Sequence, residues 1–147
     1  MSRLSDSPTV LCFDYGLRRT GAAVGQQLTG TATPLKVFTS PTRRQGWEVI
    51  EQLLEEWQPD ALVVGVPLTG SGQEQPMTEK ARRFARQLEG RFGLPVHEAE
   101  ERYSSREAQD RHRRARSAGN ARRREAARED AVAAQIILEA WFASQPD

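Results

Sequence analysis

Three acidic residues stand where a carboxylate would be costly without a cation. Asp14 ends the apolar run 10–13, Glu101 follows a short predicted strand near Val96, and Asp130 opens the apolar face of the last predicted helix. Clustered carboxylates repel one another unless cations lie among them, and their hard oxygen ligands suit Mg²⁺ or Mn²⁺. Two such ions about 4 Å apart can activate water and stabilise the leaving oxygen of a phosphodiester displacement. If the fold brings these acids together, the sequence predicts metal-dependent phosphodiester hydrolysis.

Each acid also has a simpler interpretation. Asp14 could begin an ordinary turn before Gly16. Glu101 could pair with Arg102 or another nearby arginine on the surface. Asp130 could be a helix N-terminal acid that the helix dipole stabilises. The joint metal-site hypothesis is favoured because a strongly basic segment lies between the last two acids.

That basic segment spans residues 102–128 and contains ten arginines but only three acidic residues, a net charge of +7 in a chain whose total is +1. Guanidinium groups bind phosphate in bidentate fashion, so this segment favours a polyanionic partner. A solvated helix face is the alternative. The candidate nucleic-acid contacts from this segment are Arg102, Arg113, Arg114, Arg116, Arg122, Arg123 and Arg124.

Composition excludes several classes of protein. The 147 residues are enough for one domain with its own core. No stretch approaches the roughly 18 apolar residues of a membrane span, and we expect no membrane partner. One cysteine, Cys12, excludes a disulfide framework and fits a reducing cytoplasm. His97 and His112 lack the spacing of zinc ligands.

The hydrophobic pattern predicts an α/β fold. Apolar strands at 9–14, 21–28 and 31–39, separated by short turns, indicate an antiparallel meander. Helical spacing at 46–58 and from 78 to about 92 alternates with strands at 61–66 and near Val96, and a last helix begins at about Ala127. We therefore expect a five-stranded mixed sheet, an antiparallel meander followed by αβαβ, flanked by helices. In such a sheet the ends of the first and last strands lie at one edge.

Four segments in the same order resemble the YqgF/RuvX family, which has the RNase H-like fold. They are 13–16 with 21–25 (FDYG, GAAVG), 64–68 with 72–76 (VGVPL, GQEQP), 100–104 (EERYS) and 130–138 (DAVAAQIIL). The similarity spans about residues 9–143 of a single predicted domain, 1–147. One such motif is weak, whereas four in order are specific.

The resemblance implies a divalent-metal nuclease whose carboxylate triad is Asp14, Glu101 and Asp130. It implies trimming of the 5′ end of precursor 16S ribosomal RNA. Because some relatives are described as Holliday-junction resolvases, branched DNA is the alternative substrate. It also puts Gln73 and Gln75 on a loop near the site, as candidate substrate contacts.

The chain departs from the family pattern in places. The family commonly has Asp-Glu-Arg where this chain has Glu-Glu-Arg at 100–102. Compared with RuvC-type resolvases, the central strand carries Val64 and Val66 in place of an acid, and the helix position three residues after Asp130 is Ala133. Three carboxylates in place of four would weaken occupancy of one of two metal sites.

Two other functions compete with the nuclease. The Asp-x-Gly turn at 14–16 also resembles the phosphate loop of actin-like ATPases and sugar kinases, but those need two such lobes. A non-catalytic RNA-binding module would use the arginines alone, and would bind without cleaving. The ribosome is a candidate partner, and the sequence is compatible with a monomer or a homodimer.

Overall fold

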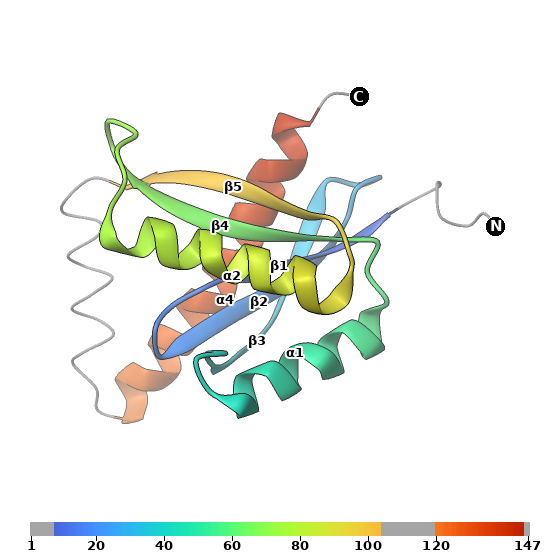
Figure 1. The fold of residues 1–147 in the computed structure, drawn as a ribbon, viewed down its shortest axis with the longest axis horizontal. Coiled ribbons are helices and arrows are strands. Elements are labelled where there is room, and N and C mark those ends of the chain that lie inside the picture. Colours follow the sequence, from blue (N-terminus) through green and yellow to red (C-terminus); the bar gives the residue numbers. More distant parts are fainter. Residues whose placement is uncertain (1–7, 104–119, 146–147) are drawn as a thin grey trace.

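The computed structural model describes residues 8–103 and 120–145, with the backbone alone at 103 and 120–130. Its centre is a five-stranded sheet in the order β3-β2-β1-β4-β5 (Figure 1). The predicted α/β class, with an antiparallel meander followed by αβαβ, is confirmed. No helix in the described ranges is long and apolar enough to cross a membrane.

The meander consists of β1 (Thr9–Asp14), β2 (Arg19–Gln26) and β3 (Thr31–Thr39), and within it β2 runs antiparallel to both β1 and β3. The turn between β1 and β2 is tight at Gly16. A Cβ there would lie 2.5 Å from the Arg19 carbonyl oxygen, so only glycine fits without moving the backbone. This turn begins two residues after Asp14 and fixes where β1 ends.

The parallel half of the sheet consists of β1, β4 (Ala61–Thr69) and β5 (Val96–Tyr103). Phe13 pairs with Val64 in β4, and Pro67 of β4 pairs with Glu101 in β5. The carboxyl ends of the three strands therefore lie at the same edge of the sheet. This edge carries two of the three predicted site acids.

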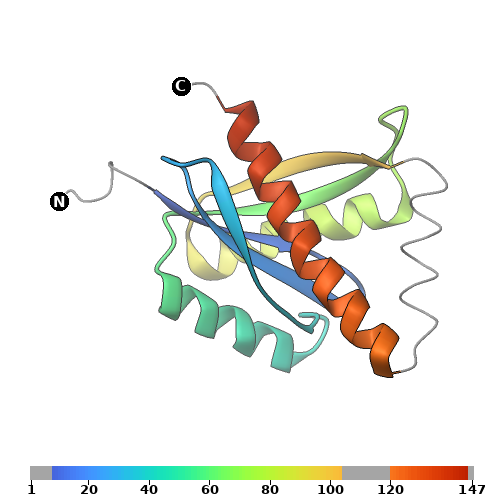
Figure 2. The same cartoon turned by 180° about the vertical axis from the view of Figure 1, so that it is seen from behind.

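Helices cover both faces of the sheet (Figures 1 and 2). Helices α1 (Arg44–Trp57) and α2 (Pro76–Phe92) lie on one face, and α4 (Asn120–Ser144) crosses the other. Strand residues alternate between two cores as a result. Leu11, Phe13, Val64 and Val66 pack toward α1 and α2. Toward α4 the core comprises Val10, Cys12, Ala32, Val63, Ile137, Leu138 and Phe142.

Several boundaries differ from the prediction. Strand β4 continues past Val66 to Thr69, and the predicted short strand near Val96 extends to Tyr103, so Glu101 lies within β5 and not after it. Helix α4 begins at Asn120, seven residues before the predicted start. Trp57, predicted on the buried face of α1, is 36% exposed. The apolar face predicted for the last helix is confirmed: Ala131, Ala134, Ile137, Leu138 and Phe142 are buried.

Candidate active site

Asp14 is a buried acid at the carboxyl end of β1. It is 8% exposed, and it is the only charged residue among the buried polar side chains of the described residues. Because strand residues alternate, Asp14 shares the α4 face of the sheet with Val10 and Cys12. The location confirms that the apolar strand ends on a carboxylate in the protein interior.

Glu101 lies on the same face of the sheet, two strands away. It is half-buried, and it follows Ala99, which packs against the core beneath α4. Its Oε1 is 3.5 Å from the point where a Cβ on Gly65 would stand. The side chain therefore reaches from β5 over β4, toward the strand that ends in Asp14.

Gly65 is the β4 residue between these two acids, and sequence reasoning missed it. Phe13 pairs with Val64, so Gly65 is level with Asp14, and Gly65 itself pairs with Ala99. A Cβ at Gly65 would also stand 2.7 Å from Ile137 Cδ1 of α4. The missing side chain lets Glu101 and α4 approach β4 closely. The importance of Gly65 depends on the strand register, which the sequence pattern does not supply.

Val64 and Val66, which the sequence comparison set against the acid of RuvC-type resolvases, face away from Asp14 in this structure. Both valines are fully buried toward α1 and α2, away from Asp14. The β4 residue that lies among the candidate site residues is Gly65. On the α4 face the described strands thus supply two carboxylates at this edge, one from β1 and one from β5.

The pKa of the Cys12 thiol is affected by both acids. Burial raises the pKa of Cys12 well above its usual range, and the negative charges of Asp14 and Glu101 raise it further. The two carboxylates therefore act on the same small region beneath α4. A protonated, fully buried thiol is a poor nucleophile, which agrees with the assignment of Cys12 to the core.

Asp130 is the eleventh residue of α4, so its interpretation as a helix N-terminal acid is wrong: the dipole effect is confined to the first turn. Its position lies seven residues before Ile137, two turns or about 10 Å along the helix axis. The C-terminal part of α4 packs on Gly25 of β2, where an added Cβ would meet Phe142 and Leu138. Gly25 pairs with Val10 near the start of β1. Helix α4 therefore runs from the start of β1, at its C-terminal end, toward the end of β1. The segment from Ile137 back to Asp130 extends toward the edge that carries Asp14.

The described side chains do not by themselves complete a metal site. Within residues 8–102 and 131–145, no three His, Cys, Asp or Glu side chains group so that they could hold an ion. Asp14 and Glu101 supply carboxylate oxygens, which are the donors that Mg²⁺ and Mn²⁺ prefer. The side chain of Asp130 lies outside the described residues. A third ligand from that position stays a prediction.

The loop after β4 lies beside this edge and holds Gln73. Gly72 has a positive φ of 87°, and a Cβ there would stand 3.1 Å from the guanidinium carbon of Arg102. Arg102, in β5, thus covers the loop next to Glu101. Gln73 is exposed, and its backbone N–H donates to the Thr69 hydroxyl. Arg102 and Gln73 therefore lie together at the carboxyl edge of the sheet, and their contact with substrate stays a prediction.

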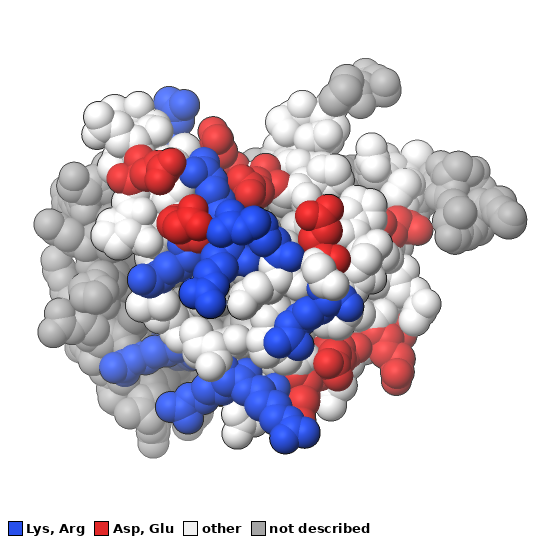
Figure 3. All heavy atoms as spheres, viewed as in Figure 1, with Lys and Arg blue, Asp and Glu red and all other residues white. Residues whose placement is uncertain are grey.

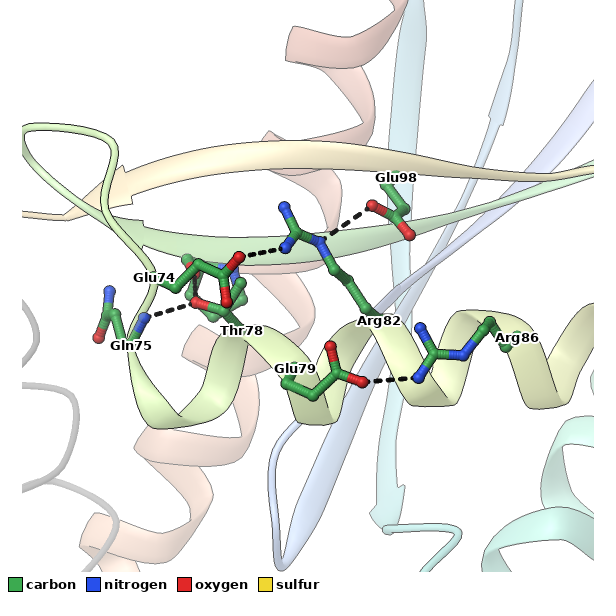
Figure 4. A network of polar contacts seen from close by, with 8 residues as sticks. Glu74, Gln75, Thr78, Glu79, Arg82, Arg86 and Glu98 are labelled. Carbon is green, nitrogen blue, oxygen red and sulfur yellow. Dashed lines mark hydrogen bonds and ion pairs between the residues drawn. The ribbon is translucent and has the colours of Figure 1, made fainter.

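A polar network fixes the other end of the loop to α2 (Figure 4). Arg82 pairs with Glu74 at 3.0 Å and with Glu98 of β5 at 3.4 Å. The backbone N–H of Gln75 donates to the Thr78 hydroxyl, which in turn donates to the Pro67 carbonyl. Gln75 is therefore the N-cap residue of α2, and Thr78, predicted as the cap, is the third residue of the helix. The backbone of Gln75 thus caps α2. The sequence had predicted Gln75 only as a substrate contact.

The remaining arginines are only partly placed. Arg113, Arg114 and Arg116 lie outside the described residues. Arg122, Arg123 and Arg124 belong to the first turns of α4, and their side chains are outside the described set. Their role in binding nucleic acid stays a prediction. The backbone nevertheless puts 122–124 on the helix that contains Asp130.

A mixed sheet in this strand order, with helices on both faces and acids at the carboxyl edge of β1 and β5, defines an RNase H-like protein. The fold is similar to that of the Fowlpox virus resolvase solved with its Holliday junction substrate, with a TM-score of 0.53 at 10% identity, covering 92% of this chain and 97% of that one.

Sequence comparison identifies the family. The sequence profile described as "RuvX: Holliday junction resolvase" matches residues 8–144. A protein of Edwardsiella ictaluri named "Putative pre-16S rRNA nuclease" is 47% identical over 93% of this chain and 96% of its own length. One of the same name from Azotobacter vinelandii is 46% identical over 97% and 99%. The chain belongs to the RuvX family, a family of nucleases.

Proposed function

We propose that this chain is a divalent-metal-dependent nuclease that processes the 5′ end of precursor 16S rRNA. The observation that carries the proposal is the pair Asp14 and Glu101 on one face of the sheet, on either side of Gly65. The names of relatives at 46–47% identity support the RNA substrate. Such a substrate implies a cytoplasmic enzyme, with the ribosome or its precursor as partner.

Asp14, Glu101 and Asp130 would hold the metal, one from β1, one from β5 and one from α4. When bound, Mg²⁺ or Mn²⁺, as one or two ions, would supply a water of lowered pKa and neutralise charge on the phosphate. The chain's own part is to fix the carboxylates. Burial of Asp14 at the end of β1 restricts its position, and the Gly65 gap keeps room for the Glu101 carboxylate.

Substrate positioning would fall to groups around this edge. Arg102 follows Glu101 in β5 on the opposite face of the strand and lies over Gly72, so its guanidinium would contact a phosphate of the substrate at the carboxyl edge of the sheet. Gln73 is exposed on the same loop and could hydrogen-bond bases or sugar. The arginines of 113–124 would add affinity along the backbone.

A second candidate substrate is branched DNA. The description of the matching family and the fold shared with a resolvase bound to a Holliday junction favour it. A four-way junction has two-fold symmetry, so a resolvase would act as a homodimer, whereas an RNA-trimming enzyme could act as a monomer.

The test compares a precursor 16S 5′-leader RNA with a four-way DNA junction, each with Mg²⁺, Mn²⁺ or EDTA. Asp14→Asn is the inactive variant, and Glu98→Gln, on the opposite face of β5, is the matched control. We expect cleavage of the RNA that needs the metal, is lost in Asp14→Asn and is retained in Glu98→Gln. Cleavage of the junction alone would favour the second substrate. Binding without cleavage of either would refute the nuclease.

A further inference from the structure

A second basic site lies on the other side of the sheet from α4. Between the start of α1 and the end of α2 there is a cavity of about 430 Å³ that Arg43, Arg44 and Arg91 line together with Trp47. Figure 3 shows Lys and Arg side chains on this side of the molecule, with Asp and Glu side chains among them. The predicted nucleic-acid contacts included none of these residues.

Two of the three arginines carry charge that the described part of the chain leaves uncompensated. Arg91 lies over the Trp47 ring, its guanidinium carbon 3.8 Å from the ring centroid. This cation–π contact holds the guanidinium in place without neutralising it. No described acidic side chain forms an ion pair with Arg43 or Arg91.

Two acids line the cavity beside the three arginines, so the formal charge of the lining is +1. Arg44 pairs with Glu48 at 3.6 Å, but the two side chains are 91% and 57% exposed. Such a surface ion pair is weak, so another anion can readily replace Glu48 beside Arg44. Glu51 is the other acid that lines the cavity. The arrangement therefore favours an anion that two or three guanidinium groups can contact at once.

The cavity adjoins the turn that follows Asp14. The backbone N–H of Arg43 donates to the Ser40 carbonyl, and the Ser40 N–H donates to the Arg18 carbonyl. The Ser40 hydroxyl also donates to the Gly16 carbonyl. Ser40 thus joins the start of α1 to the β1–β2 turn, two residues beyond Asp14. A chain of phosphates bound at the acids would pass round this edge of the sheet to reach the cavity.

We propose that the cavity formed by Arg43, Arg44, Arg91 and Trp47 binds a backbone phosphate of the nucleic-acid substrate, away from the phosphate that is cleaved. The inference rests on the proposed nuclease function, because it assigns a second contact to the same substrate. The site is sequence-independent, since guanidinium groups contact phosphate oxygens and not base edges. It would fix the register of the substrate relative to Asp14 and Glu101.

The test measures binding of a labelled precursor 16S 5′-leader RNA as a function of salt, in the Asp14→Asn background so that nothing is cleaved. Arg43→Gln/Arg91→Gln is compared with Lys36→Gln/Arg86→Gln, which removes the same net charge at exposed positions outside the cavity. The single variant Arg43→Gln leaves the contact between Arg91 and Trp47 intact, so it separates lost binding from lost packing. Circular dichroism confirms that each variant is folded.

We expect the cavity variant to bind more weakly and its plot of log affinity against log salt to flatten by about 1, as for the loss of one phosphate contact. Arg43→Gln should show part of the same effect, and the control pair should keep the original slope. An unchanged slope in the cavity variant, or equal flattening in the control, would overturn the proposal. In the Asp14 background, these outcomes are independent of cleavage. A flattened slope together with no metal-dependent cleavage by the wild-type chain would refute the nuclease function and still support phosphate binding in the cavity.

Discussion

The contact between Gly65 and α4 yields a quantitative prediction about how closely the helix packs on the candidate site. In Gly65→Ala the new methyl group would stand 2.7 Å from Ile137 Cδ1, whereas carbon atoms in contact prefer about 3.5–4.0 Å. Ile137 must therefore move by roughly 1 Å in a packed core. Overpacking of this kind typically costs about 1–3 kcal/mol. We expect about 1–2 kcal/mol here, because Cδ1 is the end of its side chain.

A second substitution should relieve the cost. Ile137→Val removes Cδ1 and by itself destabilises by about 0.5–1.5 kcal/mol. In Gly65→Ala/Ile137→Val the added methyl fills the space that Cδ1 leaves, so the double variant should be about 1 kcal/mol more stable than the sum of the single effects predicts. Glu101 Oε1, at 3.5 Å from the same point, is in ordinary contact and should keep its place.

Urea unfolding of the wild type, both single variants and the double variant measures this coupling. Gly90→Ala is the matched control: it lies in α2, and a Cβ there meets nothing within 4 Å, so it should be neutral or stabilising by up to about 1 kcal/mol. Single effects that add to within about 0.5 kcal/mol would refute the close packing of α4 on β4.

Two further predictions concern residues next to the acids. Ser40→Ala removes a buried hydroxyl that donates to the Gly16 carbonyl and accepts from Thr20, so it should cost about 1–3 kcal/mol in urea unfolding; a change near zero would contradict this hydrogen-bond network. The pKa of Cys12 is raised in the folded state, so its contribution to stability is complete below the ordinary thiol pKa and is lost as pH rises above about 9. Stability should therefore fall less steeply above that pH in Cys12→Ala than in the wild type, and identical pH profiles would contradict the shift.

Much of the fold could be predicted from local pattern. The strands 9–14 and 31–39 match the structure residue for residue, because each is bounded by turn residues and rich in strand-forming side chains. The early end assigned to β4 was wrong because Pro67 disfavours a strand interior. Pro67 nevertheless lies within the β4–β5 ladder, where it pairs with Glu101, and its carbonyl accepts a hydrogen bond from the Thr78 hydroxyl.

The start of α4 was predicted too late for a different reason. Residues 120–126 have no apolar periodicity, but alanine, arginine and glutamate all favour helix. Propensity extends the helix toward the arginines where the hydrophobic pattern gives no signal.

The candidate site was only partly accessible from sequence. Asp14 and Glu101 could be chosen because carboxylates at strand ends are conspicuous. Gly65 could not, because its importance depends on the register that sets it beside Asp14 and beneath Ile137. The cavity at Arg43 and Arg91 joins residues nearly fifty positions apart, and only tertiary packing brings them to Trp47.

Binding of Mn²⁺ to the apoprotein, followed by electron paramagnetic resonance, tests the central claim most directly. The variants are Asp14→Asn, Glu101→Gln and Asp130→Asn, with Glu98→Gln as a control on the same strand. If the three acids share one metal centre, each of the first three should weaken Mn²⁺ binding by about tenfold or more, and Glu98→Gln should bind like the wild type. Wild-type affinity for Mn²⁺ in Asp130→Asn would contradict a centre built from β1, β5 and α4.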